Sequence, residues 1–353
     1  MDIKIIGGGP VGCYSAAILS KKHNVTIYEE HKETGKPIQC TGILTDTINE
    51  IIKLKKEFVA NKIYATRVYA PNKENIRINF KKPNIIVYRD EFDKYFLDKA
   101  LKGGAKINYN NQFVKRDEVL DKITNKTTTI KYDLLVGADG PLSKVSQTFG
   151  LGRRDYLVGV QAIIKKKNDN VVDFYPHIGT YAWAVPESEE VLRVGVAAEK
   201  NPLAIFKDFS KKYKGKIISM QGGIIPLHKP KLITSKEKVF LVGDAAAQIK
   251  NTTGGGLVPG LMAAEELSKA INEDKNYETL WRNRIGRDLF AHYKLRKIMN
   301  NFKEEDWNKL IKILNEDRIK EVLSKESRDK PLKIISNILI RKPSLLKFVK
   351  QLF

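Results

Sequence analysis

Cysteine and long apolar runs are scarce in this chain, and each shortage excludes a class of protein. The 353 residues hold two cysteines, Cys13 and Cys40, which cannot form the disulfide framework of a small secreted protein. No uninterrupted apolar stretch approaches the roughly 18 residues that a helix needs to span a bilayer. Residues 1–9 enter a strand pattern directly, without the basic and apolar segments of an export signal. We therefore expect a cytoplasmic protein that is not integral to the membrane.

Acidic residues and histidine are also in short supply. Lysine and arginine number 63 against 41 aspartates and glutamates, which gives a formal net charge of +22. Such a surface attracts nucleic acid, anionic lipid or acidic protein, although a lysine-rich solvated face explains the charge equally simply. No recognition helix or RNA-binding motif accompanies the charge, so we expect no nucleic-acid partner. Neither His177 nor His228 has metal-ligand spacing to a second donor, and we expect no metal.

The first thirty residues have the pattern of a strand–helix–strand unit that binds a dinucleotide. A buried strand over residues 3–6 leads into the turn "GGGPVG", a helix follows, and the second strand "VTIY" ends at Glu29. A carboxylate at that strand end accepts hydrogen bonds from ribose hydroxyls, and Glu30 is the alternative for this role. The order of strand, glycines, helix, strand and acid predicts a dinucleotide site.

Each glycine of the turn has a separate physical role. Gly7 allows the tight turn, Gly9 lets a pyrophosphate approach the backbone, and Gly12 lets the helix pack closely on the strand. The amino terminus of the helix, with Val11 in its first turn, then faces the phosphates.

Two later segments repeat this arrangement of strand, acid and glycine. In "YDLLVGADGPLSKV" a strand precedes Asp139 and Gly140, which can bring a carboxylate and bare backbone close to a phosphate or ribityl chain. In "KVFLVGDAAAQIKNTTGGGLVPG" a strand over residues 239–242 precedes Asp244, and the glycines 254–256 open a helix. An acid there can hold a polyhydroxyl chain, while the glycines let a ring lie against the backbone.

Together the three segments resemble the glutathione-reductase-like FAD proteins that include the aromatic hydroxylases. This resemblance implies FAD as the cofactor. It implies an α/β fold in which a Rossmann-like FAD-binding domain is interleaved with an antiparallel-sheet substrate domain and followed by carboxy-terminal helices. Lys144 and Ser146 stand in the segment "SKVS", where an arginine often follows the GADG block in this group. The resemblance also implies cofactor contacts at Cys40, Thr41, Gly42, Arg89, Val114, Gly255, Gly256 and Leu257.

Three further strings, "GKPIQCTGILT", "YPHIGTYAWAVP" and "GDAAAQIKNTTGGGL", are similar to the archaeal geranylgeranyl reductases. That resemblance implies saturation of isolated carbon–carbon double bonds in the geranylgeranyl chains of ether-phospholipid precursors. It places a YxWxFP-type motif, here Tyr181, Trp183 and Pro186, beside the substrate. Val185 replaces the usual phenylalanine, and Ala247 replaces a glycine.

The side chains in these strings also have interpretations of their own. Tyr181, Trp183 and Val185 share one face of an alternating strand, which forms either plain core or an apolar binding wall. Cys40 is either a small packing residue or a flavin neighbour that donates the proton, a role that an ordered water can also fill.

Other functions stay open at this level. An aromatic hydroxylase shares the fold and the cofactor, and a non-catalytic prenyl escort protein shares the fold. No second glycine-rich βαβ unit is present to seat a nicotinamide nucleotide, so the electron donor is either NAD(P)H bound transiently or an acidic ferredoxin on the basic surface.

The cofactor segments are scattered, which predicts a discontinuous FAD-binding domain at 1–60, 88–155 and 236–275. Residues 61–87 and 156–235 alternate like strands and are assigned to the substrate domain. A helical region follows over 276–353. Its last stretch, "KPLKIISNILIRKPSLLKFVKQLF", either packs on the core or lies peripherally on an anionic membrane surface.

Overall fold

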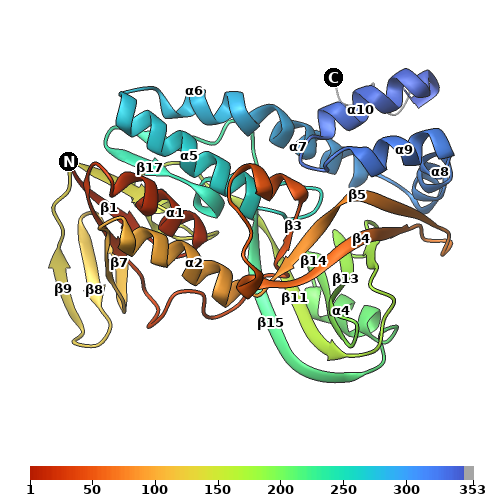
Figure 1. Cartoon of the computed structure of the whole chain (residues 1–353), viewed down its shortest axis with the longest axis horizontal. Coiled ribbons are helices and arrows are strands. Elements are labelled where there is room, and N and C mark those ends of the chain that lie inside the picture. The colour runs from red at the N-terminus through yellow and green to blue at the C-terminus, as the bar shows by residue number, and fades with distance from the viewer. Residues whose placement is uncertain (346–353) are drawn as a thin grey trace. The chain divides into compact units, whose positions relative to one another are not determined.

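The computed structural model of the chain describes residues 1–345, which pack as two compact units (Figure 1). Unit 1 comprises Met1–Ile38, Tyr88–Asp155 and Pro226–Phe290. Unit 2 comprises Gln39–Val87, Tyr156–Ile225 and the chain from Ala291 onward. Both units are built from separate segments of the chain.

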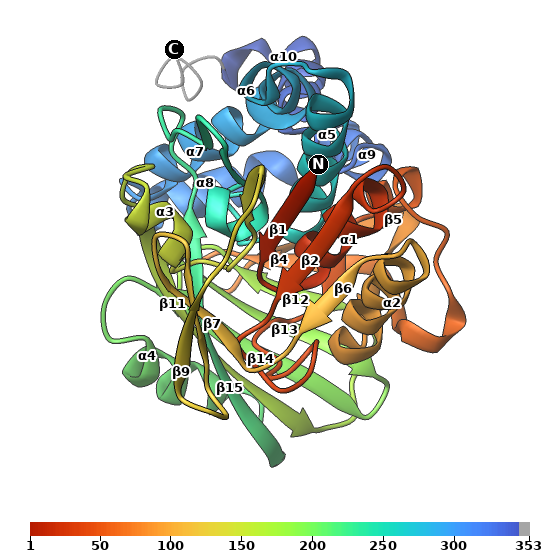
Figure 2. The ribbon, with the colours of Figure 1, turned by 90° about the vertical axis from the view of Figure 1, so that its left-hand side faces the viewer.

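A six-stranded sheet in the order β16-β17-β10-β1-β2-β6 forms the centre of unit 1. The pairs from β17 to β6 are parallel, and β16 adds an antiparallel edge. Figure 2 shows β1, β2 and β6 as neighbouring arrows. The strands are β1 (Asp2–Ile6), β2 (Asn24–Tyr28), β6 (Lys106–Asn108), β10 (Leu134–Gly137), β16 (Ser235–Lys236) and β17 (Val239–Leu241).

Both faces of the central strands are buried; one face of β1 is apolar, and the other carries Lys4, whose Nζ lies 3.4 Å from the Thr26 hydroxyl of β2. Ile3 and Ile5 of β1 have no exposed surface. A separate antiparallel sheet contains β7 (Asn111–Lys115), β8 (Glu118–Asp121) and β9 (Lys126–Thr129). The helical segments are α1 (Pro10–Leu19), α2 (Arg89–Lys102), α3 (Lys144–Thr148), η3 (Gly243–Ala246), α5 (Leu257–Glu273), α6 (Tyr277–Trp281) and η4 (Arg282–Gly286).

Unit 2 contains an eight-stranded sheet in the order β15-β11-β14-β13-β12-β4-β5-β3. Two short 3-10 turns, η1 (Asp46–Glu50) and η2 (Lys56–Phe58), lie between β3 and β4 in the chain. The strands are β3 (Ile43–Leu44), β4 (Val59–Tyr69), β5 (Asn75–Val87), β11 (Asp155–Lys165), β12 (Val172–Tyr175), β13 (Tyr181–Ser188), β14 (Val191–Ala198) and β15 (Lys216–Leu227).

One strand pair in this sheet departs from the antiparallel arrangement that the sequence predicts. The pairs β4–β5, β12–β13, β13–β14 and β11–β14 are antiparallel, but β4 and β12 run parallel. No hairpin connects these two strands, because the chain passes through unit 1 between them. A long crossover of this kind is what a parallel pair requires.

Alternation divides the side chains of β11, β13 and β14 between two faces of the sheet. One face packs with α4 (Pro202–Ser210) in a buried cluster that includes Ala162, Ala184, Val194 and Phe206. The opposite face carries the odd-numbered residues of these strands.

The carboxy-terminal region is helical, as predicted. Its helical segments are α7 (Arg287–Met299), α8 (Glu304–Leu314), α9 (Asp317–Lys325), α10 (Pro331–Arg341) and the turn η5 (Pro343–Leu345). Ile338 of α10 is 9% exposed and packs with Ile319 and Val322 of α9, so the start of the last stretch packs on its neighbours. Residues 346–353 of that stretch lie outside the described part of the chain.

The units divide the chain differently from the predicted domain boundaries. Residues 39–60 pack in unit 2, because β3 pairs with β5, whereas residues 226–235 pack in unit 1. The helical region is divided at Phe290, with the earlier helices in unit 1 and the later ones in unit 2. Within residues 1–345 no helix is long and apolar enough to cross a membrane.

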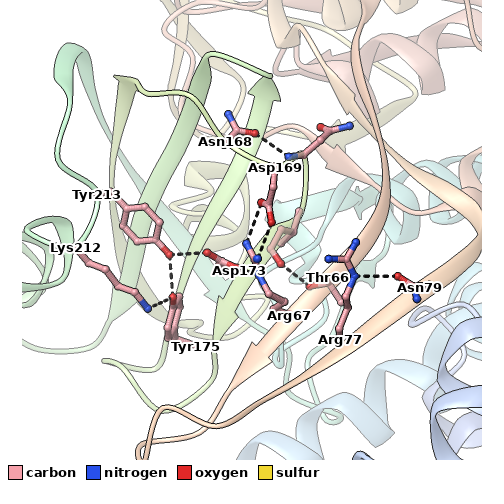
Figure 3. A network of polar contacts seen from close by, with 12 residues as sticks. Thr66, Arg67, Arg77, Asn79, Asn168, Asp169, Asp173, Tyr175, Lys212 and Tyr213 are labelled. Carbon is pink, nitrogen blue, oxygen red and sulfur yellow. Dashed lines mark hydrogen bonds and ion pairs between the residues drawn. The ribbon is translucent and has the colours of Figure 1, made fainter. Parts of the chain in front are cut away.

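An ion-pair network joins neighbouring strands within unit 2 (Figure 3). Arg67 of β4 donates to Asp173 of β12 at 2.7 Å, and its Nη1 lies 2.7 Å from the exposed Asp169. The hydroxyl of Tyr213 donates to the other oxygen of Asp173 at 3.0 Å. Since the Asp173 side chain is only 11% exposed, its charge is costly to bury, and the Arg67 guanidinium offsets most of that cost.

Replacing Arg67 should therefore destabilise unit 2. We expect Arg67→Met to lower the free energy of unfolding by about 3 kcal/mol, because a nearly buried carboxylate loses its charged partner. Arg77→Met is the matched control, since Arg77 of the neighbouring strand β5 donates to the exposed Asn79 of its own strand, and its loss should change stability by less than about 0.5 kcal/mol. Urea unfolding measures the stability of both variants, and equal midpoints would show that Arg67 does not stabilise Asp173.

Candidate functional site

The glycine turn after β1 packs directly against the turn after β10, its neighbour in the sheet. Gly7 has a φ of +105°, and a Cβ there would lie 2.7 Å from the carbonyl carbon of Ala138. A Cβ on Gly12 would lie 3.1 Å from the Ala138 side chain and overlap the carbonyl oxygen of Gly7. Both glycines are required because no side chain fits between the two turns.

The first turn of α1 keeps open space beside it. Gly9 caps the helix, and a Cβ on Gly9 would meet no atom within 4 Å. Glu29 is 7% exposed, and one of its carboxylate oxygens accepts the Gly8 N–H at 2.6 Å. Its other oxygen accepts from the backbone N–H of His31 at 2.9 Å. The predicted acid therefore lies against the glycine turn, beside an open helix terminus.

The turn after β17 packs beside the turns after β1 and β10. A Cβ on Gly243 would lie 3.2 Å from Val11, and one on Gly260 of α5 would lie 2.9 Å from the same side chain. The carboxylate of Asp244 lies under the start of α5, where a Cβ on Gly256 would be 2.6 Å from Oδ1. The strand ends of β1, β10 and β17 thus place the three sequence segments together at one edge of the sheet.

Asp244 is a carboxylate without a hydrogen-bond donor among the described residues. Burial raises its pKa to about 6, and the positive charge of Arg89 opposes that rise. Arg89 itself, the first residue of α2, makes a paired contact with Asp93 through Nε at 3.1 Å and Nη2 at 3.0 Å. A hydroxyl-rich ligand would supply the donors that Asp244 lacks.

The Asp139 carboxylate has a different role from the expected one. It accepts from the Ser143 hydroxyl at 2.6 Å and from the Val145 N–H at 3.0 Å, so it stabilises the start of α3. Gly140, with a φ of +76°, has open space where a Cβ would stand, and its backbone is the accessible part of this turn.

The side chain of Arg154 contacts Ser146. Arg154 donates to the Ser146 hydroxyl and to the Gly152 carbonyl, the latter at 2.6 Å. Burial lowers the pKa of Arg154 to about 10, and Asp139 opposes this shift. Arg154 therefore reaches back to Ser146 from eight residues later in the chain.

The remaining predicted contacts in unit 1 flank this edge. Val114 lies on β7, whose first residue, Asn111, donates its N–H to the carbonyl of Glu29 at 2.9 Å. Gly255 precedes α5 and Leu257 begins it.

Ala247 has a backbone conformation that favours glycine. Its φ is +49°, in the left-handed region that disfavours a Cβ, and its side chain is fully buried. Ala247 also accepts from the ring of His228 at 3.0 Å, and burial lowers the pKa of that imidazole to about 4. His228 thus belongs to unit 1 rather than to the substrate region in which the sequence places it.

The glycine turns, the open helix terminus and the Asp244 carboxylate fit FAD. Backbone N–H groups at α1 suit a pyrophosphate, and the two acids suit ribose and ribityl hydroxyls. Within the described residues no group of three or more metal-ligating side chains is present.

In unit 2 a row of three residues crosses the sheet on the face opposite α4. Gln161 of β11 pairs with Gly195 of β14, which pairs with Trp183 of β13. A Cβ on Gly195 would overlap the Trp183 indole, with Cε2 at 2.6 Å, so the indole lies over the glycine. The indole N–H reaches across and donates to Gln161 Oε1 at 2.9 Å.

The same glutamine holds the loop that contains Cys40. The Thr41 hydroxyl donates to Gln161 Oε1 at 2.7 Å, and the Gly42 N–H lies 3.3 Å from the Cys40 sulfur. Arg193 donates to the Thr41 carbonyl at 2.6 Å and is held in turn by Glu187 at 2.7 Å. Cys40, Thr41 and Gly42 are therefore fixed beside the face that carries Trp183.

The three residues of the aromatic motif do not share a face. Tyr181 and Trp183 lie on one side of β13, with ring centroids 6.0 Å apart. Pro186 follows Val185, so alternation places it on the opposite side. The buried Tyr181 hydroxyl has no hydrogen-bond partner among the described residues, and Arg296 lies 5.6 Å from its ring.

Sequence reasoning missed Gln161, Arg193, Gly195 and Arg154. A glycine inside an apolar strand, as at Gly195, signals that another group approaches the backbone closely. A glutamine and an arginine at inward positions of apolar strands signal buried polar contacts. Which contacts they make depends on strand register, which no local pattern provides.

The glutamine contacts predict a measurable change in thiol reactivity. Cys13 is fully buried, and burial raises its pKa, whereas Cys40 is partly exposed, so Cys40 should react first with a disulfide reagent. Gln161→Leu should speed that reaction about tenfold, because the loop loses a hydrogen bond. Cys40→Ala should abolish the native-state reaction, and an unchanged rate in Gln161→Leu would show that the glutamine does not hold the loop.

Comparisons with known proteins show what this chain is similar to. Residues 1–164 match the FAD binding domain family. The digeranylgeranylglycerophospholipid reductase of Methanocaldococcus jannaschii is 27% identical, with 99% of this chain and 98% of the relative covered. Digeranylgeranylglycerophospholipid reductase 3 of Methanosphaera stadtmanae is 28% identical over 97% of this chain and 96% of its own length.

Solved structures share the fold. A geranylgeranyl bacteriochlorophyll reductase-like protein from Thermoplasma acidophilum has a TM-score of 0.85 at 23% identity, covering 100% of this chain and 99% of its own. A flavin-dependent brominase has a TM-score of 0.72 at 15% identity, covering 99% and 100%. The predicted α/β fold and the predicted resemblance to the archaeal geranylgeranyl reductases are confirmed, and the chain carries an FAD-binding domain.

Proposed function

We propose that this chain is an FAD-dependent reductase that saturates isolated carbon–carbon double bonds in the geranylgeranyl chains of archaeal ether-phospholipid precursors. The observation that carries the proposal is the close packing of the turns after β1, β10 and β17. The relatives that match nearly the whole chain are named digeranylgeranylglycerophospholipid reductases. The reductase name of these relatives favours this function over an aromatic hydroxylase or a prenyl escort protein.

In unit 1, Gly9 and the start of α1 would hold the pyrophosphate, and Glu29 and Asp244 would accept hydrogen bonds from hydroxyls. Gly256 would leave room for the ring, because it has no side chain. When bound, reduced FAD supplies a hydride to one alkene carbon.

Residues of unit 2 would bind the lipid chain and supply the proton. An isolated alkene has no carbonyl to polarise it, so the second carbon needs an acid. We assign that role to the Cys40 thiol, which the Gly42 N–H and the Thr41 contacts orient. The apolar face around Trp183 and Tyr181 excludes water and orients the chain.

The reductase assignment is tested in a host that makes unsaturated archaeal-type lipids. Expression of the flavin-loaded protein with a reductant should add pairs of hydrogen atoms to those lipids, read as product masses. Cys40→Ala should slow hydrogenation at least about 100-fold while leaving flavin reduction unchanged. Cys13→Ala, at a fully buried position on α1, is the matched control and should retain activity. Unchanged lipid masses would reject the reductase, and a fully active Cys40→Ala would reject the thiol as the acid.

FAD affinity should depend on the ionisation of Asp244. The carboxylate accepts hydroxyl hydrogen bonds only weakly when protonated, so affinity should fall as the pH is lowered through about 6. Asp244→Asn should weaken binding at neutral pH and flatten this dependence. Flavin fluorescence titrations between about pH 5 and pH 8 measure the FAD affinity of the wild type and of the variant. A variant with the wild-type pH dependence would contradict the assignment.

The electron donor is proposed to be NAD(P)H or an acidic ferredoxin, since the sequence contains no second nucleotide-binding unit. An anionic membrane surface is proposed as a further partner, because the substrate is a lipid and the chain carries a net charge of +22.

A further inference from the structure

The first half of β15 exposes large apolar side chains at the edge of the unit 2 sheet. Ile217 is 52% exposed, Ile218 56% and Met220 48%, and every residue from Lys214 to Met220 is exposed. Successive side chains of a strand point to opposite faces. Both faces of this strand segment are therefore open, unlike the half-buried strands of an ordinary antiparallel sheet.

Lysines surround this segment. Lys166 of the β11–β12 connection approaches the backbone of Lys214, with Nζ 3.4 Å from its carbonyl oxygen, which brings two basic stretches together. Asp208 offsets Lys211 at 3.1 Å. Four lysines of these stretches have no ion-pair partner within residues 1–345, and they are Lys165, Lys167, Lys214 and Lys216.

We propose that this segment, the β15 tip (Lys214–Met220), docks the protein on an anionic lipid bilayer. The inference rests on the proposed function, because the enzyme must reach a lipid substrate. Exposed isoleucine and methionine flanked by lysines suits the headgroup boundary, where apolar side chains enter and ammonium groups meet lipid phosphates.

Two other occupants fit less well. A second copy of the chain pairing along the edge of β15 would bring two lysine clusters together, and lysines on an edge strand oppose such pairing. An acidic protein would cover one face of the strand and leave the apolar side chains of the other face in water. Immersion in a bilayer surface covers both faces.

Vesicle sedimentation tests the docking. Wild-type holoprotein should bind vesicles of equal parts phosphatidylglycerol and phosphatidylcholine, bind pure phosphatidylcholine much less, and dissociate in high salt. The double variants Ile217→Ser with Ile218→Ser and Lys214→Gln with Lys216→Gln should each weaken binding roughly tenfold.

The hairpin between β8 and β9 provides a matched control. Ile123 is 77% exposed and stands between Lys122 and Lys126, so the triple variant Ile123→Ser, Lys122→Gln and Lys126→Gln removes a similar set of groups. This variant should bind vesicles like the wild type.

Activity separates this inference from the proposed function. The β15 variants should hydrogenate substrate in detergent micelles as fast as the wild type and should lose activity only on vesicles. Wild-type vesicle binding by the β15 variants would overturn the docking proposal while leaving the reductase intact. The docking proposal would also be overturned if the β15 variants lost self-association, or lost binding to an acidic ferredoxin, while they still bound vesicles. Absence of hydrogenation in micelles by every form would instead reject the reductase.

Discussion

The structure of unit 1 depends on close contact between backbone turns at one edge of its parallel sheet. Gly7, Gly12, Gly243 and Gly260 have no side chains, and the turns after three neighbouring strands therefore pack against each other and against Val11. A single Cβ at these positions would separate them. The same contacts leave open space at Gly9 and place the buried Asp244 carboxylate at the start of α5, so the packing that stabilises the edge also brings together the residues of the proposed cofactor site.

In unit 2 a glycine again allows a close contact. Gly195 lets the Trp183 indole lie across the sheet and reach Gln161, and that glutamine also accepts from Thr41. One buried amide oxygen thus links an apolar face to the loop of Cys40. Since a buried acceptor with two donors is costly to disrupt, the thiol is held by the same contacts that order the face.

Charge and apolar exposure are distributed unevenly over the chain. The net charge of +22 alone does not distinguish a lipid surface from an ordinary solvated one. The β15 tip gives the charge a specific meaning, because there lysines border apolar side chains that the fold leaves in water. A reductase of membrane lipids needs such a surface, since its substrate cannot diffuse freely through water.

The sequence by itself determined the α/β fold, the FAD-binding domain and the family resemblance, because their motifs are short and local. Strand, glycine turn, helix and acid occur within thirty residues, and local sterics dictate their conformation. Only the tertiary structure decided that β4 and β12 are parallel and that the glycine turn after β1 packs against the turn after β10. It also decided the row of Gln161, Gly195 and Trp183. Strand register and chain direction set these relations, and both arise from pairing between segments far apart in the chain.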